Sequence, residues 1–172
     1  MLYKKKHPLI AFLTVFVFFA VIILNFSDGF SIISIKNATP FIILPVLCAY
    51  SLFSDIKRAA FAGFITGACA DSVTSGSYCF NTIALLIIGV GVCLAANNLF
   101  NKNIRAAAVL SLIVSVLYFG ADWLIFHAIG FNMQHSLEFL FSFSLASAIY
   151  TSVFVIPFYF LFKHFDKVKN QH

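Results

Sequence analysis

Residues 58–76 read RAAFAGFITGACADSVTSG, an apolar stretch that starts at an arginine and ends in a polar turn. Small residues recur every four positions, at Ala59, Gly63 and Gly67, and Asp71 continues the same spacing. Residues four apart share one face of an α-helix, and small side chains on that face let a second helix approach closely inside a membrane. The spacing therefore predicts a helix that packs against other helices and carries a carboxylate near its end.

The composition of the whole chain indicates a membrane protein. Of 172 residues, 62% are hydrophobic, only 10% are charged, and 23 are Phe. This composition leaves too little polar surface to cover a water-soluble fold. We expect an all-α integral membrane protein that forms a single transmembrane domain over residues 1–172.

Six apolar runs are candidates for membrane spans. About 20 helical residues are needed to cross ~30 Å of hydrocarbon. The expected spans cover residues 8–26, 38–54, 59–72, 80–98, 106–127 and 137–162. The third run is short for a span, so its assignment depends on the distribution of the charges.

The basic residues divide between the two sides of the membrane in a way that requires the third span. Lys and Arg are retained in cytoplasmic loops. With six spans, ten of the eleven basic residues fall on one side and only Lys36 falls on the other. Without the span at 59–72, Lys102 and Arg105 would move to the opposite side. The partition predicts a six-helix transmembrane bundle with both termini in the cytoplasm.

The net charge of +5 follows from this topology and does not indicate a nucleic-acid partner. The cluster Lys4–Lys6 precedes the first span, where basic side chains can contact anionic lipid. Membrane lipids are therefore expected partners, and nucleic acid is not.

The sequence lacks the common motifs of nucleotide-binding proteins, hydrolases and metal sites. The chain has no Gly-rich phosphate loop with a lysine, no HExxH and no GxSxG motif. No loop between spans is long enough for a soluble domain, and the four cysteines form no CxxC pair. We expect no enzymatic activity, no catalytic residues, no cofactor and no metal.

Asp122 is a further acidic residue within an expected span. It lies in YFGADWLIF (118–126), where Tyr118 and Trp123 are typical of the lipid headgroup boundary. A carboxylate about one turn below that boundary is costly unless it is hydrated or paired. Asp122 is therefore either a hydrated interfacial residue or a polar contact for a partner or ligand, and the sequence leaves both interpretations open.

From about residue 55 to 166 the sequence resembles the MreD family, the rod shape-determining membrane proteins of bacteria. The resemblance rests on a basic loop, the small-residue helix GFITGACAD (63–71), a Gly-containing turn, an apolar span with Gly89 and Gly91, a short basic loop, and the aromatic basic end PFYFLFKHFDK (157–167). The turn SGSYCFN (75–81) departs from the Gly-aliphatic form expected of the family.

The resemblance implies a non-enzymatic component of the cell-elongation complex in the bacterial cytoplasmic membrane. MreD proteins associate with MreC and with the actin-like MreB, and they help to place the glycan polymerase RodA during lateral peptidoglycan synthesis. The family carries no catalytic residues over to this chain. It carries over the segment with Gly63, Gly67 and Asp71 as a structural signature, and together with Ala59 these residues are candidates for helix packing or partner binding.

An alternative function comes from transport. Substrate-binding S components of energy-coupling-factor transporters for vitamins or micronutrients are also small, six-spanning and basic inside, and the MreD architecture is similar to theirs. They carry AxxxA spacing in the first span, whereas Ala11 and Ala20 here lie nine apart with bulky residues between them. Metal-specific S components have a histidine directly after the initiator methionine, where this chain has Leu2. The MreD-like function is preferred on these grounds.

Overall fold

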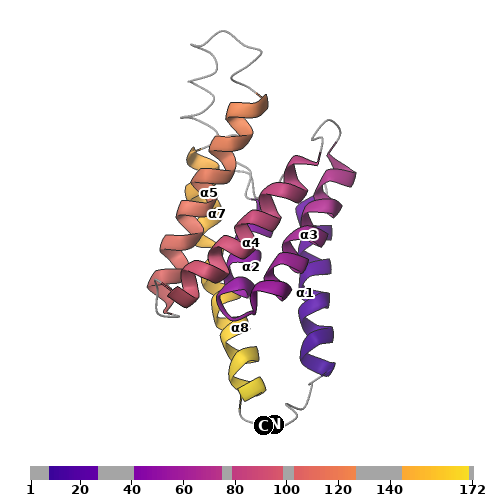
Figure 1. Cartoon of the computed structure of the whole chain (residues 1–172), viewed down its shortest axis with the longest axis vertical. Helices are drawn as coiled ribbons and strands as arrows, with labels where there is room; N and C mark the ends of the chain where they lie inside the picture. Colours follow the sequence, from indigo (N-terminus) through magenta and orange to yellow (C-terminus); the bar gives the residue numbers. More distant parts are fainter. Residues whose placement is uncertain (1–7, 27–40, 75–78, 99–102, 127–144, 171–172) are drawn as a thin grey trace.

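The computed structural model describes residues 8–26, 41–74, 79–98, 103–126 and 145–170, and every regular element in these ranges is an α-helix. The helices are α1 (Pro8–Phe26), α2 (Ile43–Leu52), α3 (Ile56–Val73), α4 (Phe80–Asn98), α5 (Ile104–Phe126), α7 (Leu145–Val153) and α8 (Val155–Asn170). They form an elongated bundle (Figure 1). The all-α class expected from the sequence is confirmed.

Three helices in the described ranges are long and apolar enough to cross a membrane. They are α4, α5 and the rod over Ser147–Val168 that α7 and α8 form together. Two further apolar helices, Phe12–Phe26 within α1 and Ile43–Leu52, are shorter. α3 is 18 residues long but contains Lys57, Arg58 and Asp71. The three long apolar helices make this chain a membrane protein.

The expected and observed helix bounds agree for α1 and α4, which cover residues 8–26 and 80–98. The last expected span, 137–162, is observed from residue 145 and continues to Asn170. Some residues of the expected spans and loops lie outside the described ranges. These are 38–40 of the second span, His127 of the fifth, 137–144 of the sixth, Lys4–Lys6, Lys36 and Lys102.

Phe154 separates α7 from α8. Its backbone N–H donates to the carbonyl of Thr151 at 3.1 Å, three residues back instead of four. Pro157 explains this irregularity, because proline has no N–H to offer the carbonyl four residues earlier and its ring crowds that turn. The two helices nevertheless continue as one rod.

α2 is the central helix of the bundle. Residues 42–49 are all buried, and α2 packs against α4, α8, α5, α3 and α1. A helix that is apolar on every side is stable only when other elements surround it. Pro45 lies in the first turn of α2, where its missing N–H would have no partner within the helix.

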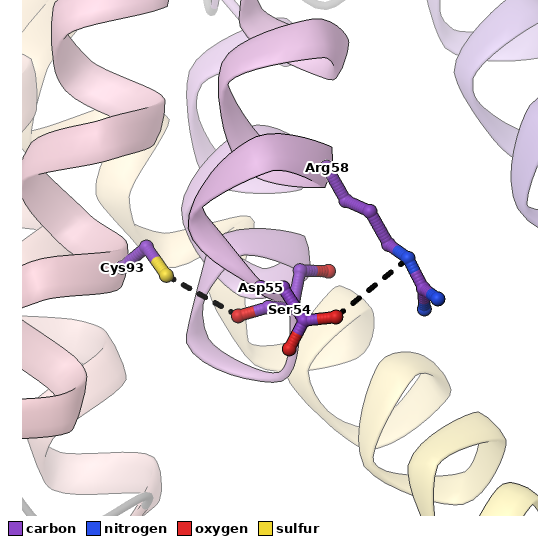
Figure 2. Close-up of polar contacts among 4 residues, drawn as sticks. All are labelled: Ser54, Asp55, Arg58 and Cys93. Carbon is purple, nitrogen blue, oxygen red and sulfur yellow. Dashed lines mark hydrogen bonds and ion pairs between the residues drawn. The ribbon is translucent and has the colours of Figure 1, made fainter.

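The turn between α2 and α3 is held from two sides. The Cys93 thiol of α4 donates to the carbonyl oxygen of Ser54 at 3.2 Å (Figure 2). On the other side, the rings of Phe53 and Tyr159 of α8 have centroids 5.5 Å apart. This turn is therefore fixed relative to both α4 and α8.

The described basic residues gather toward one end of the bundle. The α2–α3 turn, the start of α5 and the end of α8 all lie toward the lower end in Figure 1, and so does the start of α1. These segments carry the basic residues whose side chains the structure describes: Lys57, Arg58, Arg105, Lys163 and Lys167.

Candidate functional site

α3 and α4 make the most extensive helix contact within the described ranges. A methyl group on Gly63 would lie 2.9 Å from the carbonyl carbon of Leu85, and one on Gly67 would lie 2.6 Å from the carbonyl oxygen of Asn81. Real Cβ atoms essentially never come that close to backbone atoms. Only glycine at these two positions allows the α4 backbone to approach as it does.

Gly89 of α4 makes the reciprocal contact. A methyl group there would lie 2.7 Å from the carbonyl oxygen of Ala59 on α3. The stripe of small residues on α3 therefore faces α4 of the same chain, and Ala59, Gly63 and Gly67 are all buried. Its observed role is packing within the chain.

Asp71 caps the start of α4. Its Oδ1 accepts the backbone N–H of Asn81 at 3.1 Å, and its Oδ2 accepts both the backbone N–H of Thr82 at 2.8 Å and the Thr82 hydroxyl at 2.5 Å. The first N–H groups of a helix have no partner inside the helix, and a negative charge at that end is favoured by the helix dipole. The carboxylate that closes the small-residue stripe thus joins α3 to α4.

Asn81 extends this contact to α5. It is 6% exposed; its Nδ2 donates to the Thr74 hydroxyl at 3.3 Å, and its Oδ1 accepts a hydrogen bond from the Tyr118 hydroxyl. The Thr74 hydroxyl in turn donates to the carbonyl of Ala70 at 2.8 Å. One amide therefore links α3, α4 and α5, and both of its polar atoms have partners.

Tyr118 points into the bundle. The sequence predicts it at the headgroup boundary, and in the structure the residue is only 8% exposed, so its side chain faces the other helices. Its ring stacks on Phe41 with centroids 5.2 Å apart. The buried acceptor on Asn81 compensates for the desolvation of the phenolic hydroxyl.

Side chains of two other helices hold the two residues that lead into α2. The backbone N–H of Phe41 donates to the Thr151 hydroxyl of α7 at 3.1 Å, and the backbone N–H of Ile42 donates to Oδ1 of Asn25 on α1 at 2.9 Å. Both donors lie where α2 begins inside the bundle. Side chains of two other helices thus satisfy backbone groups that would otherwise be costly to bury.

These contacts make two hydrogen-bonded groups, whose side chains are together called the polar layer. The layer consists of Asn25, Asp71, Thr74, Asn81, Thr82, Tyr118 and Thr151. One group joins α1 and α7 to the residues just before α2, and the other joins α3, α4 and α5. The stacked rings of Phe41 and Tyr118 lie between the two groups. These hydrogen bonds hold the helices together, since each of them connects two elements of the chain.

Asp122 lies at the edge of this layer. It follows Tyr118 by one turn on α5, is half-buried and interacts electrostatically with it. Among the described residues, no group of His, Cys, Asp and Glu side chains is arranged to hold a metal ion.

Six residues of the polar layer were not predicted as site residues. They are Asn25, Thr74, Asn81, Thr82, Tyr118 and Thr151. One signal was available, because Asn81 and Thr82 open an apolar run only ten and eleven residues after Asp71. In an antiparallel helix pair that spacing brings the two segments to the same level.

Comparisons of the chain with protein-family models, with curated proteins and with solved structures gave no significant match.

Proposed function

We propose that this protein is a non-enzymatic membrane component of the bacterial cell-elongation complex. In this role it organises lateral peptidoglycan synthesis together with MreC-like and RodA-like membrane proteins and an MreB-type cytoskeleton. The proposal starts from the resemblance of residues 55–166 to the MreD family. The observation that supports it best is the α3–α4 hairpin, because the residues that carry the resemblance are those that pack and cap this hairpin.

A scaffold needs a surface of fixed shape, and the hairpin provides one. The stripe at Ala59, Gly63 and Gly67 is occupied by α4, so partners contact the outward face of the hairpin. That face carries exposed apolar side chains, among them Phe61 and Phe64 of α3 and Ile83 and Ile87 of α4. Helices in a membrane associate through close packing of such surfaces.

The proposed topology has six crossings and cytoplasmic termini in the bacterial cytoplasmic membrane, with an architecture similar to that of energy-coupling-factor S components. The grouping of the described basic residues toward one end supports it, since basic residues are retained on the cytoplasmic side. Reporter fusions at each terminus test it. Both fusions should report a cytoplasmic location, and an external location of either would contradict the topology.

Depletion of the protein in its native cell tests the function. We expect rods to become round and wall insertion along the side wall to stop. A nutrient requirement without a change of shape would instead indicate the S-component function, and an absence of both effects would contradict both proposals.

Complementation of the depleted cell separates a role of the hairpin from a general loss of protein. Gly91 is a suitable matched position, because a methyl group there meets no atom within 4 Å, whereas one at Gly63 meets the α4 backbone. Gly91→Ala should restore rod shape. Gly63→Leu should not, even where membrane extracts contain the variant at the wild-type level.

A further inference from the structure

We infer that the α2–α3 turn and the adjoining part of α8 bind the headgroup of an anionic glycerophospholipid. The basic side chains of this site are Lys57 and Arg58 in the first turn of α3 and Lys163 of α8. All three are exposed. The inference does not depend on the proposed role in cell elongation.

Tyr159 brings the two segments of the site together. Its ring contacts Phe53 of the turn at a centroid distance of 5.5 Å, and Nζ of Lys163 lies 5.5 Å from the centroid of the same ring. A cation at this distance from an aromatic ring is attracted to it. The Tyr159 ring thus contacts both the turn, through Phe53, and the ammonium group of Lys163.

The turn itself is fixed in place. The hydrogen bond from the Cys93 thiol to the carbonyl of Ser54 holds it against α4. Figure 2 shows that the Arg58 side chain extends from the side of the turn away from Cys93. A fixed backbone reduces the conformational entropy that is lost when charged side chains hold a ligand.

The charge of the site is positive. Asp55 is the acidic residue of the turn, and its Oδ2 lies 3.8 Å from Nε of Arg58. These two side chains are 77% and 54% exposed, so water screens their attraction. A phosphate group can therefore compete for the guanidinium, which offers several further N–H donors in one plane.

Exposed apolar side chains next to the charges favour a lipid over an acidic peptide. Ile56 directly precedes Lys57 and is 43% exposed, and Phe160 lies one turn before Lys163 and is 57% exposed. Basic side chains with apolar neighbours match an amphipathic ligand. The phosphate of such a ligand contacts the basic groups, and its acyl chains contact the apolar side chains. In a membrane protein these positions meet lipid directly.

Lipid selectivity in bilayers tests the inference. The full chain is reconstituted into phosphatidylcholine, and the bound fraction of spin-labelled phosphatidylglycerol is compared with that of spin-labelled phosphatidylcholine. One basic residue near an anionic lipid contributes about fivefold in association constant. We expect several-fold preference for phosphatidylglycerol at low salt and its loss at about 1 M salt, where the Debye length falls to about 3 Å.

Variants locate the site. The double substitution Arg58→Gln with Lys163→Gln should remove most of the preference, while Arg58→Lys should retain it. The matched control is Arg105→Gln, which removes an exposed basic residue from the start of α5 and should change the preference by less than about twofold. Circular dichroism should be unchanged in all variants, because each altered side chain is exposed.

Three results would overturn the inference. The first is equal binding of the two lipids by the wild-type chain; binding of an added acidic peptide as well would assign the surface to a protein partner. The second is a preference that high salt does not reduce. The third is a loss of preference in the control that equals, for each charge removed, the loss in the double variant, which would show that total charge acts instead of this site.

Discussion

The carboxylate of Asp71, near the end of α3, lies 2.8 Å from the backbone nitrogen of Thr82 in the first turn of α4 and accepts its hydrogen bond. A helix is usually capped by the residue just before it. Here Cys79 holds that position, with φ at 63°, and the cap comes instead from the preceding helix. The contact therefore couples the formation of α4 to its packing on α3.

Substitution of Asp71 should distinguish its hydrogen bonds from its charge. Asp71→Leu leaves three donors on Asn81 and Thr82 without their acceptor, and we expect a loss of about 3 kcal/mol in the free energy of unfolding. Asp71→Asn keeps one acceptor oxygen and should cost about 1 kcal/mol. Titration with a denaturing detergent measures both values, and equal losses would show that the negative charge itself is required.

The close contact of α3 with α4 predicts a difference between two glycines. Gly63→Ala places a methyl group against the backbone at Leu85, so the helices must separate, at about 1–3 kcal/mol of unfolding free energy. Gly91→Ala meets open space and should be neutral or stabilising by up to about 1 kcal/mol through helix propensity. Similar losses at the two positions, in the same denaturation experiment, would contradict the observed packing.

Removal of one hydroxyl tests the link between α4 and α5. Tyr118→Phe keeps the ring that stacks on Phe41 but removes the donor to Asn81. We expect about 1–2 kcal/mol of destabilisation, because the amide oxygen stays buried without that donor. Tyr50→Phe is the control, since it keeps the ring contacts of Tyr50 with Phe18 and Phe162. A larger effect in the control than in Tyr118→Phe would refute the assignment.

The hydrogen bond from Phe41 to Thr151, in front of α2, makes a separate prediction. Thr151→Val has nearly the same shape but offers no acceptor to the Phe41 N–H, and hydrogen bonds of this type contribute about 1 kcal/mol. Thr151→Ser keeps the hydroxyl and should retain most of the stability. Hydrogen exchange of the Phe41 amide gives an independent readout, which should become faster in Thr151→Val and stay slow in Thr151→Ser.

The apolar runs and the spacing of small residues predicted the bounds of two helices and the packed face of α3. The apolar runs place α1 and α4 at their observed bounds, because hydrophobicity and helix length are properties of a continuous segment. The four-residue spacing of Ala59, Gly63 and Gly67 identified the packed face of α3, since helical periodicity brings these residues to one side.

Tyr118 shows where local reasoning stops. An aromatic residue with a hydroxyl near the end of an apolar run fits the headgroup boundary as well as it fits a buried position with a hydrogen-bond partner. The choice depends on Asn81, which lies 37 residues away in the sequence. No pattern within α5 contains that information.

By itself the sequence determined the membrane class, the helical segments and the residue types that can pack or cap, because these follow from composition and periodicity. Tertiary structure alone decided that the stripe of α3 faces α4, that Asp71 accepts the N–H groups of Asn81 and Thr82, and that Asn25 and Thr151 accept those of the residues before α2. The physical reason is that a buried N–H must find an acceptor somewhere in the folded chain. Which acceptor lies within reach depends on how the helices pack.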